Sequence, residues 1–306
     1  MSTSTNAHQS RPRTLLAVHA HPDDECIGTG GSLARYAAEG VRTILVTCTD
    51  GAVGEISDPA LATPDNLAEV RARELDASVQ ILGVKRLVKL GYRDSGMAGT
   101  ADNDHPASFN QANLDDAIER VVQVVRAERP QVIVTYDERG GYGHPDHIRA
   151  HLVAVAAFEA AGDATRYPAA GPAWTPTKLY YSVFPRSAME RFAKRLREAG
   201  IESPFGERPA EEAAPAVAAT EPAPTATATE EPQFGVSDDR VTTTIDVSAY
   251  VLPKRASLEA HRTQMGPEQF FMRLPPELFA DAFSRETFQR IAGPGETPET
   301  DFFAGI

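Results

Sequence analysis

TLLAVHA at residues 14–20 runs directly into His21-Pro22-Asp23-Asp24-Glu25, and this stretch decides the fold class. A short, mostly apolar run is typical of a buried strand in a parallel sheet. Ser32 to Glu39 has a helical pattern that ends at Gly40, and a second apolar run follows at Thr43 to Cys48. These residues predict a strand–helix–strand unit with the polar cluster at the carboxyl end of its first strand.

Strands and helices continue to alternate along the chain. The patterns predict helices over 66–82, 114–128, 145–161 and 188–199, and strands over 87–90, 132–136 and 179–184. This alternation indicates an α/β fold with a Rossmann-like, mostly parallel sheet flanked by helices. In such sheets, ligands bind where loops leave the carboxyl ends of the strands. Two polar clusters lie at such ends, at residues 21–25 and 137–147.

A change of composition marks the expected domain boundaries. Residues 207–232 contain little besides Ala, Pro, Thr and Glu, so they have too little apolar bulk to offset the entropy of ordering them. We expect this stretch to be a disordered, flexible linker. It would follow a catalytic α/β domain at 14–206, whose core is expected to end near residue 199, and residues 1–13 are expected to form a disordered N-terminus.

Regular patterns return after the expected linker. Val241 to Val247 has strand character, and Lys254 to Gln264 has helix character. Residues 233–306 are therefore expected to form a C-terminal α+β extension that packs on the core.

Charge and cysteine content limit the function classes. The chain has 43 Asp and Glu against 30 Lys and Arg, a net charge of −13, so its average surface repels nucleic acid and anionic lipid. Cys26 and Cys48 are the two cysteines and form no metal or redox motif, which fits a reducing cytoplasm. The polar start and the lack of a run of about 18 apolar residues argue against secretion and membrane spanning. We expect a soluble cytoplasmic protein with no nucleic-acid or membrane partner; an oligomer is left open.

The first polar cluster contains the elements of a metal site. His21 and Asp24 leave the first strand three residues apart, and the distant His147 follows a similar turn. Two imidazoles and one carboxylate, with an open fourth position, describe a catalytic zinc site, although the same donors also suit ferrous iron. Asp23 would point away from Asp24 and is free to act as a base on water. The alternative is an ordinary solvated turn, in which Pro and Asp are common.

The second cluster favours catalysis over a simple turn. Gly140-Gly141-Tyr142-Gly143-His144-Pro145-Asp146-His147 follows another apolar strand, and its glycines permit close backbone approach. His144 is a candidate to donate to a developing oxyanion or to protonate a leaving amine, with Asp146 orienting it. Tyr142 is a candidate for a further hydrogen bond to the tetrahedral intermediate, although Tyr142 and His144 also admit purely structural roles.

These two clusters together resemble the LmbE/PIG-L family of zinc-dependent N-acetylglucosaminyl de-N-acetylases, over about residues 14 to 185. The resemblance implies that His21, Asp24 and His147 bind zinc and that Asp23 is the general base. It also implies that His144 and Tyr142 assist the oxyanion and the leaving group.

Two further positions resemble the mycothiol branch of that family. They are Arg71, in Arg-x-x-Glu-Leu, and Asp94, in Arg-Asp-Ser-Gly-Met-Ala-Gly-Thr. By resemblance, Arg71 would bind a substrate hydroxyl or phosphate group, and Asp94 would contact a sugar or belong to the shell around the site. Without the resemblance, a solvated helix face is the favoured interpretation of Arg71.

The resemblance implies a small amino-sugar substrate but is divided between two reactions. The loop Asp94 to Thr100 resembles the deacetylase that acts on N-acetylglucosaminyl-inositol, which is the expected activity. Ala260 to Gln264, followed by Phe270-Phe271, resembles the amidase that cleaves the glucosaminyl–cysteine amide of mycothiol conjugates. Deacetylation of another N-acetyl sugar is a further alternative.

Two other function classes compete with an amide hydrolase. A sugar- or nucleotide-binding protein without chemistry would have no need of the spare base Asp23. A two-metal phosphoesterase would need more carboxylate ligands than can be assigned.

Three neighbouring features are expected to be structural. His19 lies within the first strand and is expected to be a packed core histidine, and Cys26 is expected to be a buried thiol. Gly28-Thr29-Gly30-Gly31 precedes a helix but lacks the spacing of a dinucleotide fingerprint, so nicotinamide binding is not expected.

Overall fold

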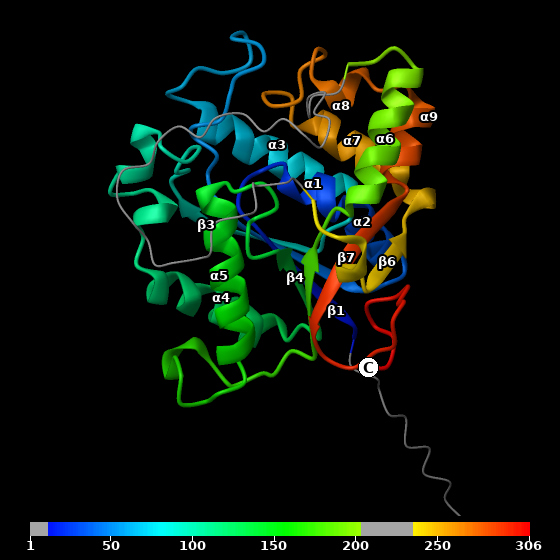
Figure 1. Cartoon of the computed structure of the whole chain (residues 1–306). Helices are drawn as coiled ribbons and strands as arrows, with labels where there is room; N and C mark the ends of the chain where they lie inside the picture. The colour runs from blue at the N-terminus through cyan, green and yellow to red at the C-terminus, as the bar shows by residue number, and fades with distance from the viewer. Residues whose placement is uncertain (1–11, 203–234) are drawn as a thin grey trace, which may run out of the picture.

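One mixed sheet forms the centre of the computed structural model, which describes residues 12–202 and 235–306 (Figure 1). Within these residues, the strands lie in the order β3-β2-β1-β4-β5-β7-β6. Five strands pair in parallel: β1 (Thr14–His19), β2 (Arg42–Thr49), β3 (Arg86–Tyr92), β4 (Val132–Tyr136) and β5 (Lys178–Ser182). Strand β7 (Arg285–Ala292) runs antiparallel to β5, and β6 (Thr243–Asp246) at the edge runs antiparallel to β7. The predicted Rossmann-like, mostly parallel sheet is confirmed.

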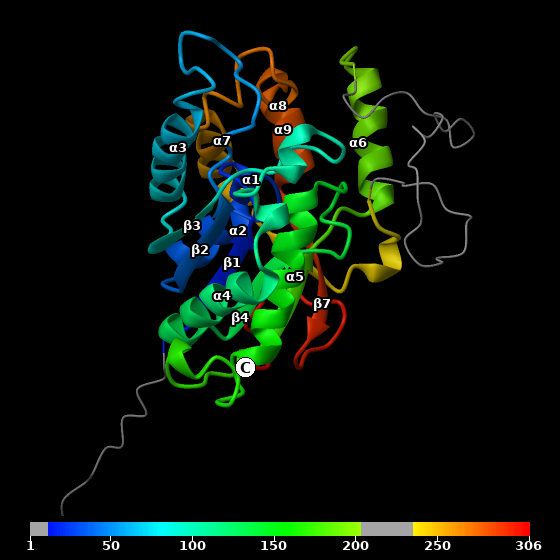
Figure 2. The same cartoon turned by 90° about the vertical axis from the view of Figure 1, so that its left-hand side faces the viewer.

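Helices cover both faces of the sheet. The longer ones are α2 (Gly30–Ala38), α3 (Leu67–Ile81), α4 (Leu114–Glu128), α5 (Pro145–Ala160), α6 (Arg186–Glu198), α7 (Val251–Ala260) and α9 (Pro276–Phe283), and the short ones are α1 (Asp24–Gly28) and α8 (Phe270–Arg273). Single 3-10 turns occur at Ala101–Asp104, Phe109–Gln111, Pro168–Ala170, Asp238–Arg240 and Ser248–Tyr250. Helices α4 and α5 pack on one face and α2 and α3 on the other, which gives three layers (Figure 2).

The position of β1 in the sheet explains why its residues 15–18 are all apolar. Leu16 and Val18 point into the core shared with α4 and α5, whereas Leu15 and Ala17 point into the core shared with α2 and α3. Successive side chains of a strand alternate between faces, and both faces are covered here. Residues 15–18 therefore form a continuous hydrophobic run between Thr14 and His19.

The order of the strands places a topological switch point between β1 and β4. Strand β1 lies between β2 and β4, and the chain leaves β1 toward one side and β4 toward the other. Such a switch point leaves room for a ligand beside the carboxyl ends of both strands. The two polar clusters predicted from the sequence follow β1 and β4, so both lie at this switch point.

The expectation that the α/β core ends near residue 199 is wrong. Strand β7 pairs with β5, and β6 pairs with β7, so residues beyond 235 complete the same sheet. Helix α7 packs against α3, and α6, α7 and α9 share an apolar cluster with α1. The predicted linker at 207–232 lies outside the described residues, as does the N-terminus up to residue 11.

The C-terminal segment also occupies the glycine-rich start of α2. The carboxylate of Glu286, on β7, accepts hydrogen bonds from the backbone amides of Gly31 and Ser32, both at 2.8 Å, and pairs with Lys254 Nζ at 2.6 Å. A Cβ at Gly31 would lie 2.5 Å from a methyl group of Val247, so only glycine permits this contact. The amides that resemble a phosphate cradle are thus bonded to a carboxylate of the chain itself.

The buried guanidinium of Arg126, on α4, holds the end of α5 and the loop that follows it. Its nitrogens donate to the carbonyl oxygens of Ala160, Ala161, Asp163, Arg166, Tyr167 and Gly171, at 2.6 to 3.4 Å. Helix α5 begins with the second polar cluster, so this contact anchors the far end of the helix that carries the site.

We predict that Arg126→Met lowers the free energy of unfolding by about 3 kcal/mol or more. Several buried carbonyl groups would lose their donor, and each orphaned group costs roughly 1–3 kcal/mol. Denaturant unfolding checks this, with Lys194→Met on the exposed face of α6 as a control that should stay within about 0.5 kcal/mol. A loss below about 1 kcal/mol in Arg126→Met would contradict the interpretation.

Candidate metal centre and active site

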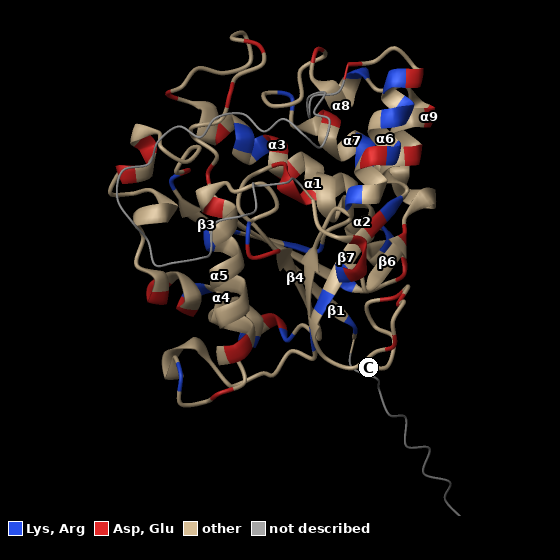
Figure 3. Cartoon of the chain, in the orientation of Figure 1, with Lys and Arg blue, Asp and Glu red and all other residues tan. Residues whose placement is uncertain are grey.

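Donor atoms of three residues converge at the carboxyl ends of β1 and β4. His21 Nδ1 lies 3.2 Å from His147 Nε2 and 3.3 Å from Asp24 Oδ2, and His147 Nε2 lies 3.3 Å from Asp24 Oδ1. Asp24 opens α1, the acidic segment near the centre of Figure 3, and His147 lies in the first turn of α5. The fold thus brings together the three residues predicted to be metal ligands.

The spacing of these donors fits a small divalent ion. Bonds of about 2.0–2.1 Å to a tetrahedral zinc ion separate its ligands by about 3.3 Å. The two imidazole nitrogens lie at that spacing, and each lies 3.3 Å from one of the two oxygens of Asp24. Two imidazoles and a carboxylate are also a donor set that zinc accepts. The residues present therefore fit a metal ion with a further position open to substrate or water.

Each of the three donors is oriented by a second contact. His21 Nε2 faces Asp146 Oδ2 at 3.2 Å, which leaves Nδ1 free of its proton for the metal position. His147 Nδ1 faces the carbonyl oxygen of Gly140 at 3.1 Å. Asp24 Oδ2 accepts hydrogen bonds from the backbone N–H of His21 and the hydroxyl of Tyr136, both at 2.7 Å. Such second contacts fix tautomer and direction and raise metal affinity.

Asp23 lies beside this group, and its side chain takes a different direction. Its φ of 113° is in the left-handed region, which is unusual for a residue with a Cβ. Its carboxylate pairs with Arg71 Nη2 at 3.0 Å. Burial raises the pKa of Asp23 to about 6, although the Arg71 guanidinium acts against that shift. A carboxylate with such a pKa, outside the ligand group, suits a general base.

Arg71 is buried behind Asp23. Besides Asp23, its guanidinium donates to the carbonyl oxygens of Pro22, at 2.5 Å, and Gly51, at 2.9 Å. Only 3% of the residue is exposed. The contacts that the structure gives Arg71 therefore support the turn that carries the base, and its direct contact with substrate stays a prediction.

His144 is placed as a neutral hydrogen-bond donor. It is the N-cap of α5, and its Nδ1 accepts the backbone N–H of Asp146 at 3.1 Å. Burial lowers the pKa of His144 to about 4, with help from the neighbouring His21 and His147. The neutral ring consequently carries its proton on Nε2, where it can be donated to a substrate oxygen.

Asp146 reaches His144 through its backbone, whereas its side chain serves other partners. Its carboxylate faces His21 Nε2 and accepts from the backbone N–H of Ser95 at 2.9 Å and from the Ser95 hydroxyl at 2.5 Å. Asp94 Oδ1 lies 3.5 Å from the same His21 nitrogen and accepts from Gly96 N at 2.8 Å. Asp94 is thus placed in the shell around His21.

Tyr142 lies at the mouth of the site. It is 52% exposed, and its ring contacts His147 edge-on with the ring centroids 4.8 Å apart. A half-exposed phenol next to buried imidazoles is accessible to an incoming substrate, and its hydrogen bond to the tetrahedral intermediate stays a prediction.

Three further residues, which the sequence patterns did not predict, organise the site. Tyr136 is the last residue of β4, and its hydroxyl accepts the backbone N–H of Ala20 as well as donating to Asp24. Ser95 holds Asp146, and Glu25 accepts the backbone N–H of Asp23 at 2.9 Å. Tyr136 could have been recognised from the sequence, because a residue with a polar group at the carboxyl end of an apolar strand indicates a place beside the site.

The neighbouring residues expected to be structural are buried. His19 Nε2 lies 2.8 Å from Thr29 Oγ1, and burial lowers the pKa of His19. Cys26 and Cys48 are free and buried, and burial raises the pKa of each thiol. His19 as a core histidine and Cys26 as a buried thiol are both confirmed. Among the residues that the structure describes, the helices are too short or too polar to span a membrane.

The chain is similar in sequence to a known protein family and to full-length proteins. A family model described as PIG-L: GlcNAc-PI de-N-acetylase matches residues 16–158. The 1D-myo-inositol 2-acetamido-2-deoxy-alpha-D-glucopyranoside deacetylase 1 of Catenulispora acidiphila is 42% identical over 100% of this chain and 96% of its own length. The corresponding deacetylase of Streptomyces avermitilis is 42% identical over 96% of this chain and 97% of its own length.

Solved structures share the fold at low sequence identity. N,N'-diacetylchitobiose deacetylase from Pyrococcus horikoshii has a TM-score of 0.61 and 18% identity, covering 92% of this chain and 85% of that one. The 4-carboxy-2-hydroxymuconate hydratase of Pseudomonas putida has a TM-score of 0.56 and 16% identity, covering 92% and 98%. Because a deacetylase and a hydratase share this fold, the fold alone does not fix the reaction. The sequence relatives decide the family: the chain belongs to the PIG-L family of de-N-acetylases, amidohydrolases that act on carbon–nitrogen bonds other than peptide bonds, as its two motifs predicted.

Proposed function

We propose that the protein is a zinc-dependent deacetylase that removes the acetyl group from an inositol-linked N-acetylglucosamine. The observation that carries this proposal is the convergence of His21, Asp24 and His147 within 3.3 Å of one another, beside a carboxylate, Asp23, that is not part of the group. The full-length relatives named as 1D-myo-inositol 2-acetamido-2-deoxy-alpha-D-glucopyranoside deacetylases support this substrate.

The metal and the base have separate tasks. A zinc ion held by His21, Asp24 and His147 would act as a Lewis acid on the amide carbonyl and lower the pKa of water at the site. Asp23 takes one proton from the attacking water, whose oxygen forms a bond to the carbonyl carbon. Arg71 and the Glu25 contact to the Asp23 amide hold that carboxylate in place.

His144 and Asp23 complete the reaction. The Nε2–H of the neutral His144 donates to the oxyanion of the tetrahedral intermediate, and Tyr142 adds a hydrogen bond from the mouth of the site. The carbon–nitrogen bond then breaks as the proton held by Asp23 passes to the amine nitrogen. The products are a free amino sugar and acetic acid, which keeps the second proton of the water and ionises to acetate on release.

The other function classes are less well supported. The full-length relatives named above are deacetylases, so the resemblance of residues 260–264 to an amidase does not decide the substrate. A second donor group, His21, Asp94, His144 and Asp146, shares His21 with the first, and its members are bonded to Ser95, Gly96 and each other. A two-metal phosphoesterase is therefore not favoured. The free thiols Cys26 and Cys48 support the proposal of a cytoplasmic enzyme.

We predict that Asp23→Asn lowers kcat for release of the free amine from N-acetylglucosaminyl-inositol by about 10²- to 10⁴-fold, the usual contribution of a general base. Bound metal should stay at one ion per chain, because Asp23 lies outside the ligand group. Amine release and elemental analysis check both, and Asp76→Asn on the exposed side of α3 is the matched control. Full activity in Asp23→Asn would rule out the assigned base.

The same assay distinguishes the substrates. The unmodified, zinc-loaded protein should release amine from N-acetylglucosaminyl-inositol far faster than from a mycothiol S-conjugate. The reverse order would make the chain an amidase. Two metal ions per chain would favour the phosphoesterase.

Loss of the contact that orients His21 should weaken metal binding. We predict that Asp146→Asn lowers zinc affinity by about 10- to 100-fold, because Asp146 fixes the tautomer that leaves Nδ1 of His21 free. Chelator competition measures the affinity, with Asp76→Asn again as control. Stripped protein should regain activity with zinc; restoration by ferrous iron alone would change the assigned metal.

A further inference from the structure

The C-terminal turn at residues 260–264 lies against the catalytic turn. It follows α7 and lies outside residues 16–158, which the family model matches. Within it, His261 Nε2 lies 2.7 Å from Glu25 Oε1, and both side chains are fully buried. A residue more than 200 positions away therefore contacts the segment that carries Asp23 and Asp24.

Glu25 connects this turn to the base. Its Oε1 accepts from His261 Nε2, from the Ser78 hydroxyl at 2.5 Å and from the Cys26 thiol at 3.2 Å. Its Oε2 accepts the backbone N–H of Asp23 at 2.9 Å. The carboxylate thus holds the backbone of the base with one oxygen while His261 holds the other.

Asp23 needs such support because of its backbone conformation. A non-glycine residue at a φ of 113° is strained, and such strain persists only where surrounding contacts fix it. The amide of Asp23 donates to Glu25, and its carbonyl oxygen accepts the backbone N–H of Cys26 at 3.0 Å. The direction of the carboxylate depends on these contacts as well as on Arg71.

We infer that His261 is a positioning residue for the general base: through Glu25 it fixes the backbone of Asp23, and so the place from which the carboxylate takes a proton from water. This inference rests on the proposed deacetylation. It assigns to the C-terminal segment a part in the catalytic step.

Packing alone does not explain why a polar imidazole is buried at position 261. The imidazole is fully buried, and its Nδ1 has no hydrogen-bond partner among the described residues. Burying a half-satisfied polar ring is costly, and an apolar side chain would fill the space at less cost. Among the described residues, the ring nitrogens hydrogen-bond only to Glu25, through Nε2. An apolar residue at position 261 would lose this hydrogen bond.

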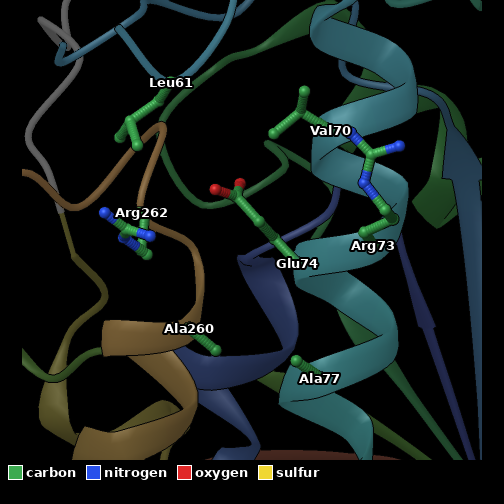
Figure 4. Close-up of a pocket in the computed structure, with 7 residues that line it drawn as sticks. All are labelled: Leu61, Val70, Arg73, Glu74, Ala77, Ala260 and Arg262. Atoms are coloured by element: carbon green, nitrogen blue, oxygen red, sulfur yellow. The ribbon is translucent and has the colours of Figure 1, made fainter.

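A separate carboxylate already anchors the same turn. Glu74, on α3, accepts from Thr263 N at 2.8 Å and from the Thr263 hydroxyl at 2.6 Å. Figure 4 shows Glu74 pointing toward the segment that carries Arg262, across a shallow cavity of about 290 Å³ between α3 and α7. Among the described residues, the Glu74 carboxylate hydrogen-bonds to Thr263 and not to Asp23, so it provides a control that separates anchoring of the turn from positioning of the base.

The test compares four single substitutions in the full chain, three at His261 and one at Glu74. His261→Leu removes the contact to Glu25, and His261→Asn shortens the side chain so that it falls short of Glu25. His261→Gln retains an amide N–H that can reach the carboxylate. Glu74→Gln weakens the anchor of the same turn but leaves the bond between His261 and Glu25.

We predict that His261→Leu and His261→Asn lower kcat by about 10- to 100-fold, with KM changed less than about 3-fold, since a misplaced base slows the chemical step. In His261→Gln, kcat should be within about 3-fold of that of the unmodified protein. Glu74→Gln should lower the melting temperature with kcat nearly unchanged. If His261→Leu fails to fold, His261→Asn and His261→Gln still make the comparison.

Hydrogen exchange of the segment spanning residues 21–26 gives a readout that does not depend on turnover. It should become faster by about 10-fold in the two breaking variants and stay unchanged in Glu74→Gln. Equal loss of kcat in Glu74→Gln and His261→Asn, or unchanged exchange in His261→Asn, overturns the inference. A second zinc ion held by Glu25, Cys26 and His261, whose donor atoms lie within 4.8 Å of one another, would overturn it as well. If the unmodified protein releases no amine, the proposed function fails, while the exchange comparison still decides whether His261 holds the turn.

Discussion

The pairing of β1 with β4 is the constraint on which the site depends. Leu15, Leu16 and Ala17 pair in register with Val132, Ile133 and Val134, and the metal ligands follow these strands on separate loops. A slip of one residue would turn every side chain of a strand to the opposite face. The hydroxyl of Tyr136 secures the register where it matters, because it accepts the Ala20 amide at the end of β1 and donates to Asp24.

The C-terminal segment is held to this frame by buried charges. Glu286 pairs with Lys254 while capping α2, and Glu299 pairs with Lys178 at 2.5 Å on β5. Removing one member of a buried pair leaves an uncompensated charge in the core, which is far more costly than losing a surface ion pair. Residues 235–306 therefore belong to the same folding unit as β1 to β5. This explains how a turn as distant as that of His261 can support the base.

Elements that depend on contacts between residues close in the sequence could be predicted, whereas those that depend on contacts between distant residues could not. Strand β4 and helix α4 have the predicted bounds, since β4 is a continuous apolar run and the side chain of Asn113 caps α4 by accepting two backbone amides. Strand β7 was missed because Arg285–Ala292 mixes charged and apolar residues. Glu286 is buried there only because Lys254 and the start of α2 bind it. Likewise, the residue types of the site were evident locally, whereas the contact of His261 with Glu25 depends on a fold that no local pattern describes.

Asp23 and Asp24 also show which properties can be predicted from the local sequence and which depend on the fold. A sequence of two aspartates predicts two acids but not which one binds metal and which one moves a proton. The left-handed backbone of Asp23 turns its side chain toward Arg71, where burial outweighs the guanidinium and raises the pKa to about 6. At Asp24, burial acts in the same direction, but His147 and His21 outweigh it and hold the pKa well below its usual range. Two neighbouring carboxyl groups with pKa values driven apart are suited to opposite roles, a permanent anion for the metal and a proton acceptor for the reaction. Both environments are built by residues from other strands and helices, so the difference in role is a property of the fold.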